Sequence, residues 1–227
     1  MHDDNIPLPQ EKTRGGEHSQ FALLTNRRFG PLFVTQFFGA FNDNLFKNAL
    51  VVLLTFQAAS WTTLKPEALA NLAAGIFMLP FFLFSATAGQ LADKLDKARL
   101  ARYTKLLEIV IVGLAVLGFV LKSLPFLLGV LFLMGLQSTL FGPVKYAILP
   151  QHLRPDELVG GNALVEAGTY VSILLGTLSG GLLAGVSSGT VWISAVALGI
   201  AAIGYLASRG IPPAPAPEPE LKINPNV

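Results

Sequence analysis

The chain has 227 residues, of which 52% are hydrophobic and only 13% are charged, and its formal net charge is +2. This composition excludes an ordinary soluble domain, and so small a net charge argues against nucleic-acid binding. The sequence has no cysteine, which excludes disulfides and thiolate metal ligands, and we expect neither a metal nor a cofactor.

The chain begins with a polar segment and continues with long apolar stretches. A stretch of about 20 residues with few charges is typical of a membrane-spanning helix. Six such stretches are predicted, at residues 31–57, 69–91, 103–122, 124–149, 160–186 and 188–207. The sequence therefore predicts an all-α polytopic membrane protein. Its parts are a polar tail (residues 1–30), a six-helix domain (31–207) and a proline-rich linker (208–227) that we expect to be solvated.

The first span contains the polar sequence "AFNDNLFKNA" at residues 40–49. At 100° per residue, one face of the helix carries Gln36, Asp43 and Lys47, flanked by Asn44 and Asn48, while Asn42 points elsewhere. An ionised side chain inside a membrane costs about 2.5–3.5 kcal/mol on insertion scales and usually marks a functional site. We therefore predict that this polar stripe faces a cavity and binds substrate. The alternative is that Asp43 and Lys47, four residues apart, only neutralise each other.

The connection after the second span reads "GQLADKLDKARLAR" at residues 89–102. It resembles the loop signature of the major facilitator superfamily in Gly89, Leu91, Asp93, Lys94, Lys97 and Arg99, although Asp96 stands where that signature usually has a second glycine. Gly89 is expected to allow close helix approach, and Asp93 to cap a helix or pair with an arginine. The alternative is an ordinary basic cytoplasmic turn.

The later spans contain a second pair of charges and several small residues. Lys145 and Glu166 are expected at equal depth, where they could form an interhelical ion pair with a binding or gating role, or one that only fixes helix packing. Pro143, after Gly142, is expected to permit a bend. Glu108, near Lys105, is given only a structural, interfacial role. The fifth span carries the small residues Gly168, Gly176, Gly180, Gly181 and Ala184, which predict close helix packing.

The distribution of lysine and arginine predicts the orientation. Twelve of them lie at or near one end of the predicted bundle, namely Lys12, Arg14, Arg27, Arg28, Lys94, Lys97, Arg99, Arg102, Lys105, Arg154, Arg209 and Lys222. Only Lys65 and Lys122 lie at the other end. The positive-inside rule therefore places both termini in the cytoplasm.

Three further stretches carry a resemblance to one family: "TQFFGAFNDNLFKNALVVLL" at 35–54, "FGPVKYAIL" at 141–149 and "GNALVEAGTYVSILLGTLSGGLLAG" at 161–185. They resemble the bacterial lysophospholipid transporters of the major facilitator superfamily, and also the transporter-like domain fused to acyltransferase and acyl-carrier-protein ligase domains in lipid repair. The resemblance implies the N-terminal six-helix half of a twelve-span fold built from 3+3 inverted repeats. It also implies the bacterial inner membrane, a second six-helix half and acyltransferase domains encoded downstream.

The resemblance favours a half-transporter that flips lysophospholipids across the inner membrane for reacylation. For that substrate we assign Asp43 to the head-group ammonium, Lys47 to its phosphate, and Gln36, Asn44, Asn48, Lys145 and Glu166 to the same path. Two alternatives stay open: a proton-coupled exporter with Asp43 as proton carrier, and a membrane anchor of a repair enzyme that does not transport. Catalysis is not expected, because His152 and Asp156 have three residues between them where glycerolipid acyltransferases have four.

Overall fold

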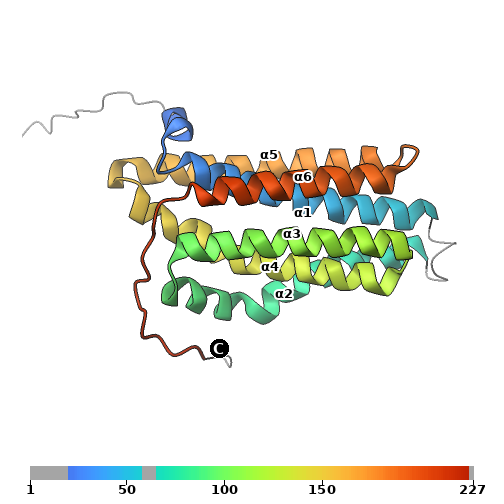
Figure 1. Ribbon diagram of the computed structural model, residues 1–227, viewed down its shortest axis with the longest axis horizontal. Coiled ribbons are helices and arrows are strands. Elements are labelled where there is room, and N and C mark those ends of the chain that lie inside the picture. The colour runs from blue at the N-terminus through green and yellow to red at the C-terminus, as the bar shows by residue number, and fades with distance from the viewer. Residues whose placement is uncertain (1–19, 58–64, 225–227) are drawn as a thin grey trace, which may run out of the picture.

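The computed structural model describes residues 20–57 and 65–224, so the first 19 residues of the predicted polar tail lie outside it. Within these ranges six α-helices run along a common direction, as Figure 1 shows. They are α1 (Gly30–Gln57), α2 (Pro66–Lys94), α3 (Lys97–Leu121), α4 (Leu124–His152), α5 (Leu158–Ala184) and α6 (Gly189–Arg209), preceded by the short 3-10 helix η1 (Gln20–Thr25). The described chain begins and ends at the same end of the bundle (Figure 1).

Five helices are long and apolar enough to cross a membrane: Pro66–Lys94, Lys97–Leu121, Leu124–His152, Pro155–Ala184 and Gly189–Arg209. Apolar side chains such as Phe82 and Leu182 are 88% and 72% exposed, as expected of a surface that faces lipid. The predicted class of all-α polytopic membrane protein is therefore confirmed. The helix α1 is not among the five, because Asp43, Lys47 and its amide side chains lower its mean hydropathy.

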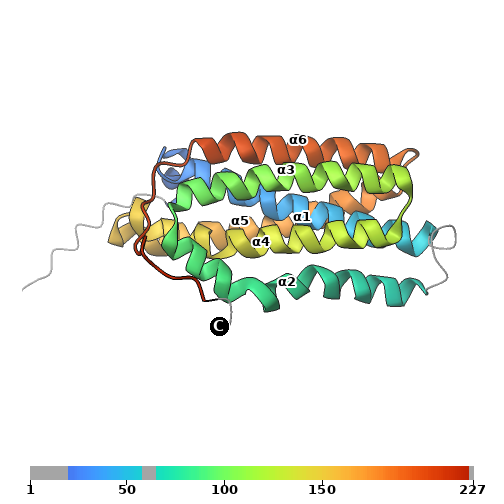
Figure 2. The ribbon, with the colours of Figure 1, turned by 60° about the horizontal axis from the view of Figure 1, so that its bottom comes forward.

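The helix packing has the symmetry expected of two three-helix repeats. The helix α1 packs mainly on α5 and α6, and α4 packs mainly on α2 and α3. Exchanging α1 with α4, α2 with α5 and α3 with α6 converts one set of contacts into the other, while the contact between α3 and α6 joins the two sets. Because successive helices run in opposite directions, exchanged helices are antiparallel, as in an inverted repeat (Figure 2).

Glycines on one face of α5 allow its backbone to approach α1. A Cβ atom at Gly180 would collide with the backbone carbonyl of Leu45, and one at Gly176 with that of Phe41. A Cβ atom at Gly168 would lie only 2.6 Å from the ring of Phe33. The packing role predicted for these three glycines is confirmed. It is wrong for Gly181, where a Cβ atom would meet nothing within 4 Å.

We expect Gly180→Ala to lower the free energy of unfolding by about 1–3 kcal/mol, because the added methyl group would force α1 and α5 apart. Gly181→Ala is the matched control, one residue away and in open space. Detergent-solubilised protein would be unfolded with denaturant, and the two midpoints compared with wild type. Equal midpoints for the two variants would contradict a close approach of α1 and α5 at Gly180.

The loop between α2 and α3 differs in detail from expectation. Asp96, not Asp93, caps α3, since its carboxylate accepts a hydrogen bond of 2.8 Å from the backbone N–H of Arg99. A Cβ atom at Gly89 would meet nothing within 4 Å, so close helix approach does not require this glycine. Helix α4 continues through Pro143 to His152, although the proline nitrogen cannot donate a hydrogen bond.

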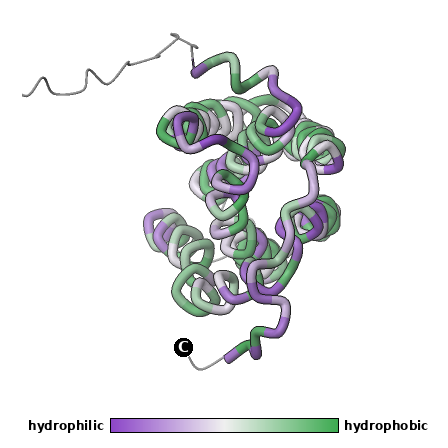
Figure 3. Tube along the Cα trace, turned by 90° about the vertical axis from the view of Figure 1, so that its left-hand side faces the viewer, coloured by the Kyte–Doolittle hydropathy of each residue, from purple (hydrophilic) through white to green (hydrophobic). Residues whose placement is uncertain are grey.

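The segment after α6 is docked on the protein, which corrects the prediction of a solvated linker. Ala214 is fully buried, and its carbonyl accepts a hydrogen bond of 2.9 Å from the backbone N–H of Lys97. The N–H of Ala214 donates in turn to the carboxylate of Asp96 at 3.2 Å. The segment crosses the end of the bundle (Figure 3) and connects α6 to the start of α3. These contacts depend on Asp96 and Lys97, which lie far away in the sequence. The composition of the segment could not reveal them and therefore predicted solvation.

Candidate substrate-binding site

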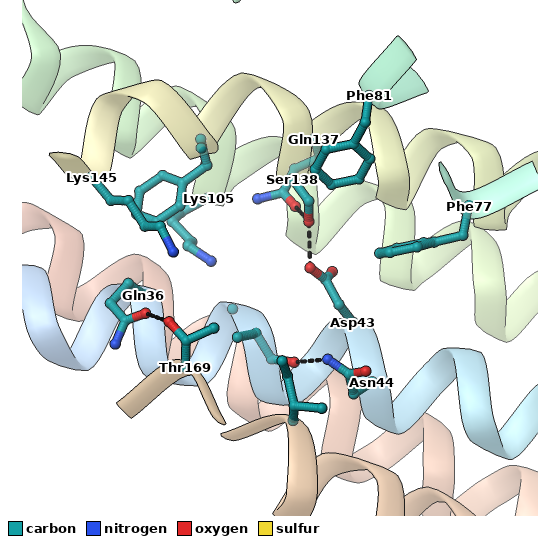
Figure 4. Close-up of a pocket in the computed structure, with 15 residues that line it drawn as sticks. Gln36, Asp43, Asn44, Phe77, Phe81, Lys105, Gln137, Ser138, Lys145 and Thr169 are labelled. Atoms are coloured by element: carbon teal, nitrogen blue, oxygen red, sulfur yellow. Dashed lines mark hydrogen bonds between the residues drawn. The ribbon is translucent and has the colours of Figure 1, made fainter. Parts of the chain in front are cut away.

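A pocket with charged and apolar side chains in its lining lies between α1, α2, α3, α4 and α5 and has a volume of about 230 Å³. Its lining comprises Gln36, Gly39, Ala40, Asp43, Asn44, Phe77, Phe81, Lys105, Gln137, Ser138, Phe141, Gly142, Lys145, Thr169 and Ile173. Four of the predicted site residues are therefore brought together: Gln36, Asp43, Asn44 and Lys145 (Figure 4). The pocket combines both signs of charge with aromatic walls.

Asp43 is the acidic group of this pocket. One carboxylate oxygen accepts a hydrogen bond from the hydroxyl of Ser138 on α4, whereas the other, Oδ1, is buried and has no hydrogen-bond partner among the residues that the structure describes. A buried carboxylate oxygen without a partner is costly, which makes it a ready acceptor for a ligand donor. On the same face of α1, Gln36 is held by Thr169 of α5, whose hydroxyl donates to its side-chain oxygen at 2.9 Å.

A second polar cluster lies behind the pocket, between α1, α3 and α4. Lys105 and Glu108 form an ion pair of 2.6 Å, and their side chains are only 1% and 2% exposed. The other carboxylate oxygen of Glu108 accepts a hydrogen bond of 2.9 Å from Asn42, and Gln137 donates to the oxygen shared with Lys105 at 3.4 Å. The interfacial role predicted for Glu108 is therefore wrong, because this side chain is buried among α1, α3 and α4.

Asn42 does point away from the predicted stripe, as expected, but toward this buried cluster. Sequence reasoning did not include Lys105, Gln137 and Ser138 in the site. Two signals could have found them: Lys105 and Glu108 are three residues apart on one helix face, and Gln137 and Ser138 are polar residues deep in an apolar span.

The far end of the predicted stripe lies outside the pocket lining. The amino group of Lys47 donates to the side chain of Asn44 at 3.0 Å and lies 5.2 Å from the ring centroid of Phe77. It forms no ion pair with Asp43, which argues against the alternative that these two residues only neutralise each other. Asn48, one helical turn beyond Asn44 on α1, donates a hydrogen bond of 3.0 Å to the hydroxyl of Thr177 on α5.

The expected ion pair between Lys145 and Glu166 is also replaced by other contacts. Glu166 accepts a hydrogen bond from the hydroxyl of Tyr146. Lys145 lies over the ring of the same tyrosine, with its amino nitrogen 4.7 Å from the centroid. Tyr146 thus contacts both charged side chains, and Lys145 also lines the pocket.

Comparison with protein families gives a match to the Major Facilitator Superfamily over residues 32–225. This range contains the six described α-helices, apart from the first two residues of α1, and the docked segment after α6. The chain belongs to the Major Facilitator Superfamily. Residues 89–99, which resemble the superfamily's loop signature, comprise the end of α2, the connecting residues Leu95 and Asp96, and the start of α3.

Several curated relatives in the superfamily are named lysophospholipid transporter LplT. That of Pectobacterium carotovorum is 35% identical over 182 residues, which cover 78% of this chain and 41% of the relative. That of Cronobacter sakazakii is 31% identical over 190 residues, covering 82% and 43%, and that of Enterobacter sp. (strain 638) is 31% identical over 212 residues, covering 91% and 48%. The chain thus spans less than half the length of these relatives. No solved structure matches it significantly.

Proposed function

We propose that this chain is the N-terminal half of a lysophospholipid transporter of the bacterial inner membrane, with six spans and both ends in the cytoplasm. The observation that carries the proposal is the pocket, in which Asp43 and Lys145 face one space beside Phe77 and Phe81. The names of the similar transporters supply the substrate class, and a second six-helix half is expected to cover the open side of this pocket.

The chemistry of the pocket suits a zwitterionic head group. The ammonium of an ethanolamine head could donate to Oδ1 of Asp43, the oxygen without a protein partner. Its phosphate could bind the amino group of Lys145, because a compact ammonium is a good partner for phosphate oxygens. Lys47, assigned to the phosphate from sequence alone, lies outside the pocket lining, so Lys145 takes its place in the proposal.

The size of the pocket limits what it can enclose. Sites for whole drug-sized ligands usually measure about 300–1,000 Å³, and this pocket is smaller, at about 230 Å³. A head group fits such a space, but a head group with its acyl chain does not. We infer that the acyl chain leaves the pocket past Phe77 and Phe81, which line it from α2.

The proposed topology can be tested with single cysteines, because the chain has none of its own. Ser187 lies in the exposed turn between α5 and α6, and Glu220 is exposed in the segment after α6. A membrane-impermeant thiol reagent added outside intact cells should label Ser187→Cys and leave Glu220→Cys unlabelled until the cells are opened. Labelling of position 220 from outside would contradict cytoplasmic ends.

The function itself is tested by transport. The chain and its proposed second half, reconstituted together in lipid vesicles, should take up radiolabelled lysophosphatidylethanolamine, whereas empty vesicles should not. The chain without a second half should transport poorly, because the charged side chains that line its pocket would be open to lipid. No uptake by the assembled protein would refute the proposal.

A further inference from the structure

We propose that Lys105 is a second cation for the phosphate of the substrate, and that it stays paired with Glu108 until substrate binds. This inference rests on the proposed function, because it names the group that recognises the anionic part of the head. Lys105 comes from α3 and, in the part of the chain that the structure describes, is the only residue of that helix in the pocket lining.

A glycine on α1 makes room for the amino group of Lys105. A Cβ atom at Gly39 would collide with this nitrogen and would lie 3.4 Å from the adjacent carbon, Cε. Because position 39 has no side chain, the lysine passes across α1 and its amino group reaches the pocket (Figure 4). Lys105 and Lys145 thus enter the same space from two different helices.

The hydrogen bonds of the cluster leave Lys105 able to take a second partner. An ammonium carries three N–H donors, and among the described residues only the carboxylate of Glu108 accepts a hydrogen bond from this one. Glu108 does not depend on the lysine alone, since Asn42 and Gln137 also donate to it. When the amino group turns toward a phosphate oxygen, the carboxylate keeps these two donors, so neither charge is left bare.

The free-energy cost of burying the ion pair of Lys105 and Glu108 argues that the pair has a role in substrate binding. Two buried charges that serve only each other are often less stable than two well-packed apolar side chains. Here the pair borders a pocket that already presents Asp43 and Lys145. With Lys105 turned to the phosphate and Asp43 on the ammonium, both ends of a zwitterionic head would have a partner of opposite charge.

The test uses two variants in the assembled transporter. Lys105→Gln/Glu108→Gln replaces the pair by two amides that can hydrogen-bond each other, which removes the cation without leaving a buried charge. Gly39→Ala keeps both charges but displaces the amino group, and the backbone can tolerate it because the displaced atom ends a flexible side chain. Gly113→Ala is the control, a glycine of α3 with nothing within 4 Å.

Uptake of lysophosphatidylethanolamine and of lysophosphatidic acid would be measured for each protein. Loss of a charge-assisted hydrogen bond should raise KM for both lipids about tenfold or more in the double variant. Gly39→Ala should also raise KM for both lipids, and Gly113→Ala should have the KM values of the wild type. By contrast, Asp43→Asn should affect the ethanolamine lipid much more than the other.

Unchanged KM values in both variants, beside normal wild-type uptake, would overturn the inference and leave the proposed function standing. A rise confined to lysophosphatidylethanolamine would also overturn it, because Lys105 would then act through Asp43 and not on the phosphate. Wild-type protein that takes up neither lipid would refute the proposed function, and this inference with it.

Discussion

Replacing Asp43 by asparagine is expected to abolish uptake of lysophosphatidylethanolamine at lipid concentrations near the wild-type KM, while expression and membrane insertion stay normal. The substitution keeps the size of the side chain and an acceptor for the hydroxyl of Ser138, but it removes the negative charge that faces the pocket. Hydrogen bonds to charged groups contribute about 1.5–3 kcal/mol, so binding of the ammonium should weaken by roughly tenfold to a hundredfold. Uptake into vesicles with equal amounts of reconstituted protein measures this.

The matched control is Asp156→Asn, the same change at a carboxylate whose side chain is 71% exposed and does not line the pocket. A proton carrier at position 43 would fail as well, so both proteins are also assayed with the proton gradient collapsed. Wild-type uptake that persists without the gradient, and disappears in Asp43→Asn, supports head-group recognition. Wild-type rates in the asparagine variant would show that Asp43 does not recognise the head group.

Replacing Glu108 by leucine is expected to be among the most destabilising single changes in the bundle. Glu108 accepts hydrogen bonds from Lys105, Asn42 and Gln137, and all three donors would lose this acceptor at once. Breaking a buried ion pair by removing one partner costs about 3–5 kcal/mol. Denaturant unfolding in detergent would show this as a large shift of the midpoint.

Two further variants separate the charge from the packing. Lys105→Met leaves Glu108 with its two amide donors, so it should destabilise less than Glu108→Leu. Lys105→Met/Glu108→Gln removes both charges and keeps an acceptor, so its cost should be well below the sum of the costs of Lys105→Met and Glu108→Gln measured singly. Glu67→Gln, at an exposed position of α2, controls for loss of a carboxylate. Additive costs would mean that the pair contributes nothing as a pair.

Most of the fold could be predicted from the sequence, because each apolar stretch is long enough to identify one helix. The helices extend beyond several predicted spans, as in α2, which reaches Lys94, and α3, which begins at Lys97. The reason is that a polar helix end stays helical outside the apolar region, where hydropathy no longer marks it. The docked segment after α6 could not be predicted, since it depends on hydrogen bonds between Ala214 and two residues at the start of α3.

Four of the seven predicted substrate-binding residues line the pocket, namely Gln36, Asp43, Asn44 and Lys145. The helical spacing of Gln36 and Asp43 correctly placed both on one face, and that face lines the pocket. Spacing within one helix cannot tell which other helix supplies the partner. The sequence therefore suggested Lys47 for Asp43, but the structure supplies Ser138 from α4. Lys105 was missed in the sequence because a lysine one turn inside a basic helix end resembles an ordinary cation at the membrane interface.

The most direct test of the account is a structure of the assembled transporter with lysophosphatidylethanolamine bound. The account predicts the ammonium within about 2.7–3.2 Å of Oδ1 of Asp43, the normal range for an N–H···O hydrogen bond. It also predicts the phosphate on the side of Lys145 and Lys105, with the acyl chain leaving past Phe77. A head group bound outside this pocket, or one whose phosphate lies on Asn44 and Lys47 with Asp43 unoccupied, would contradict it.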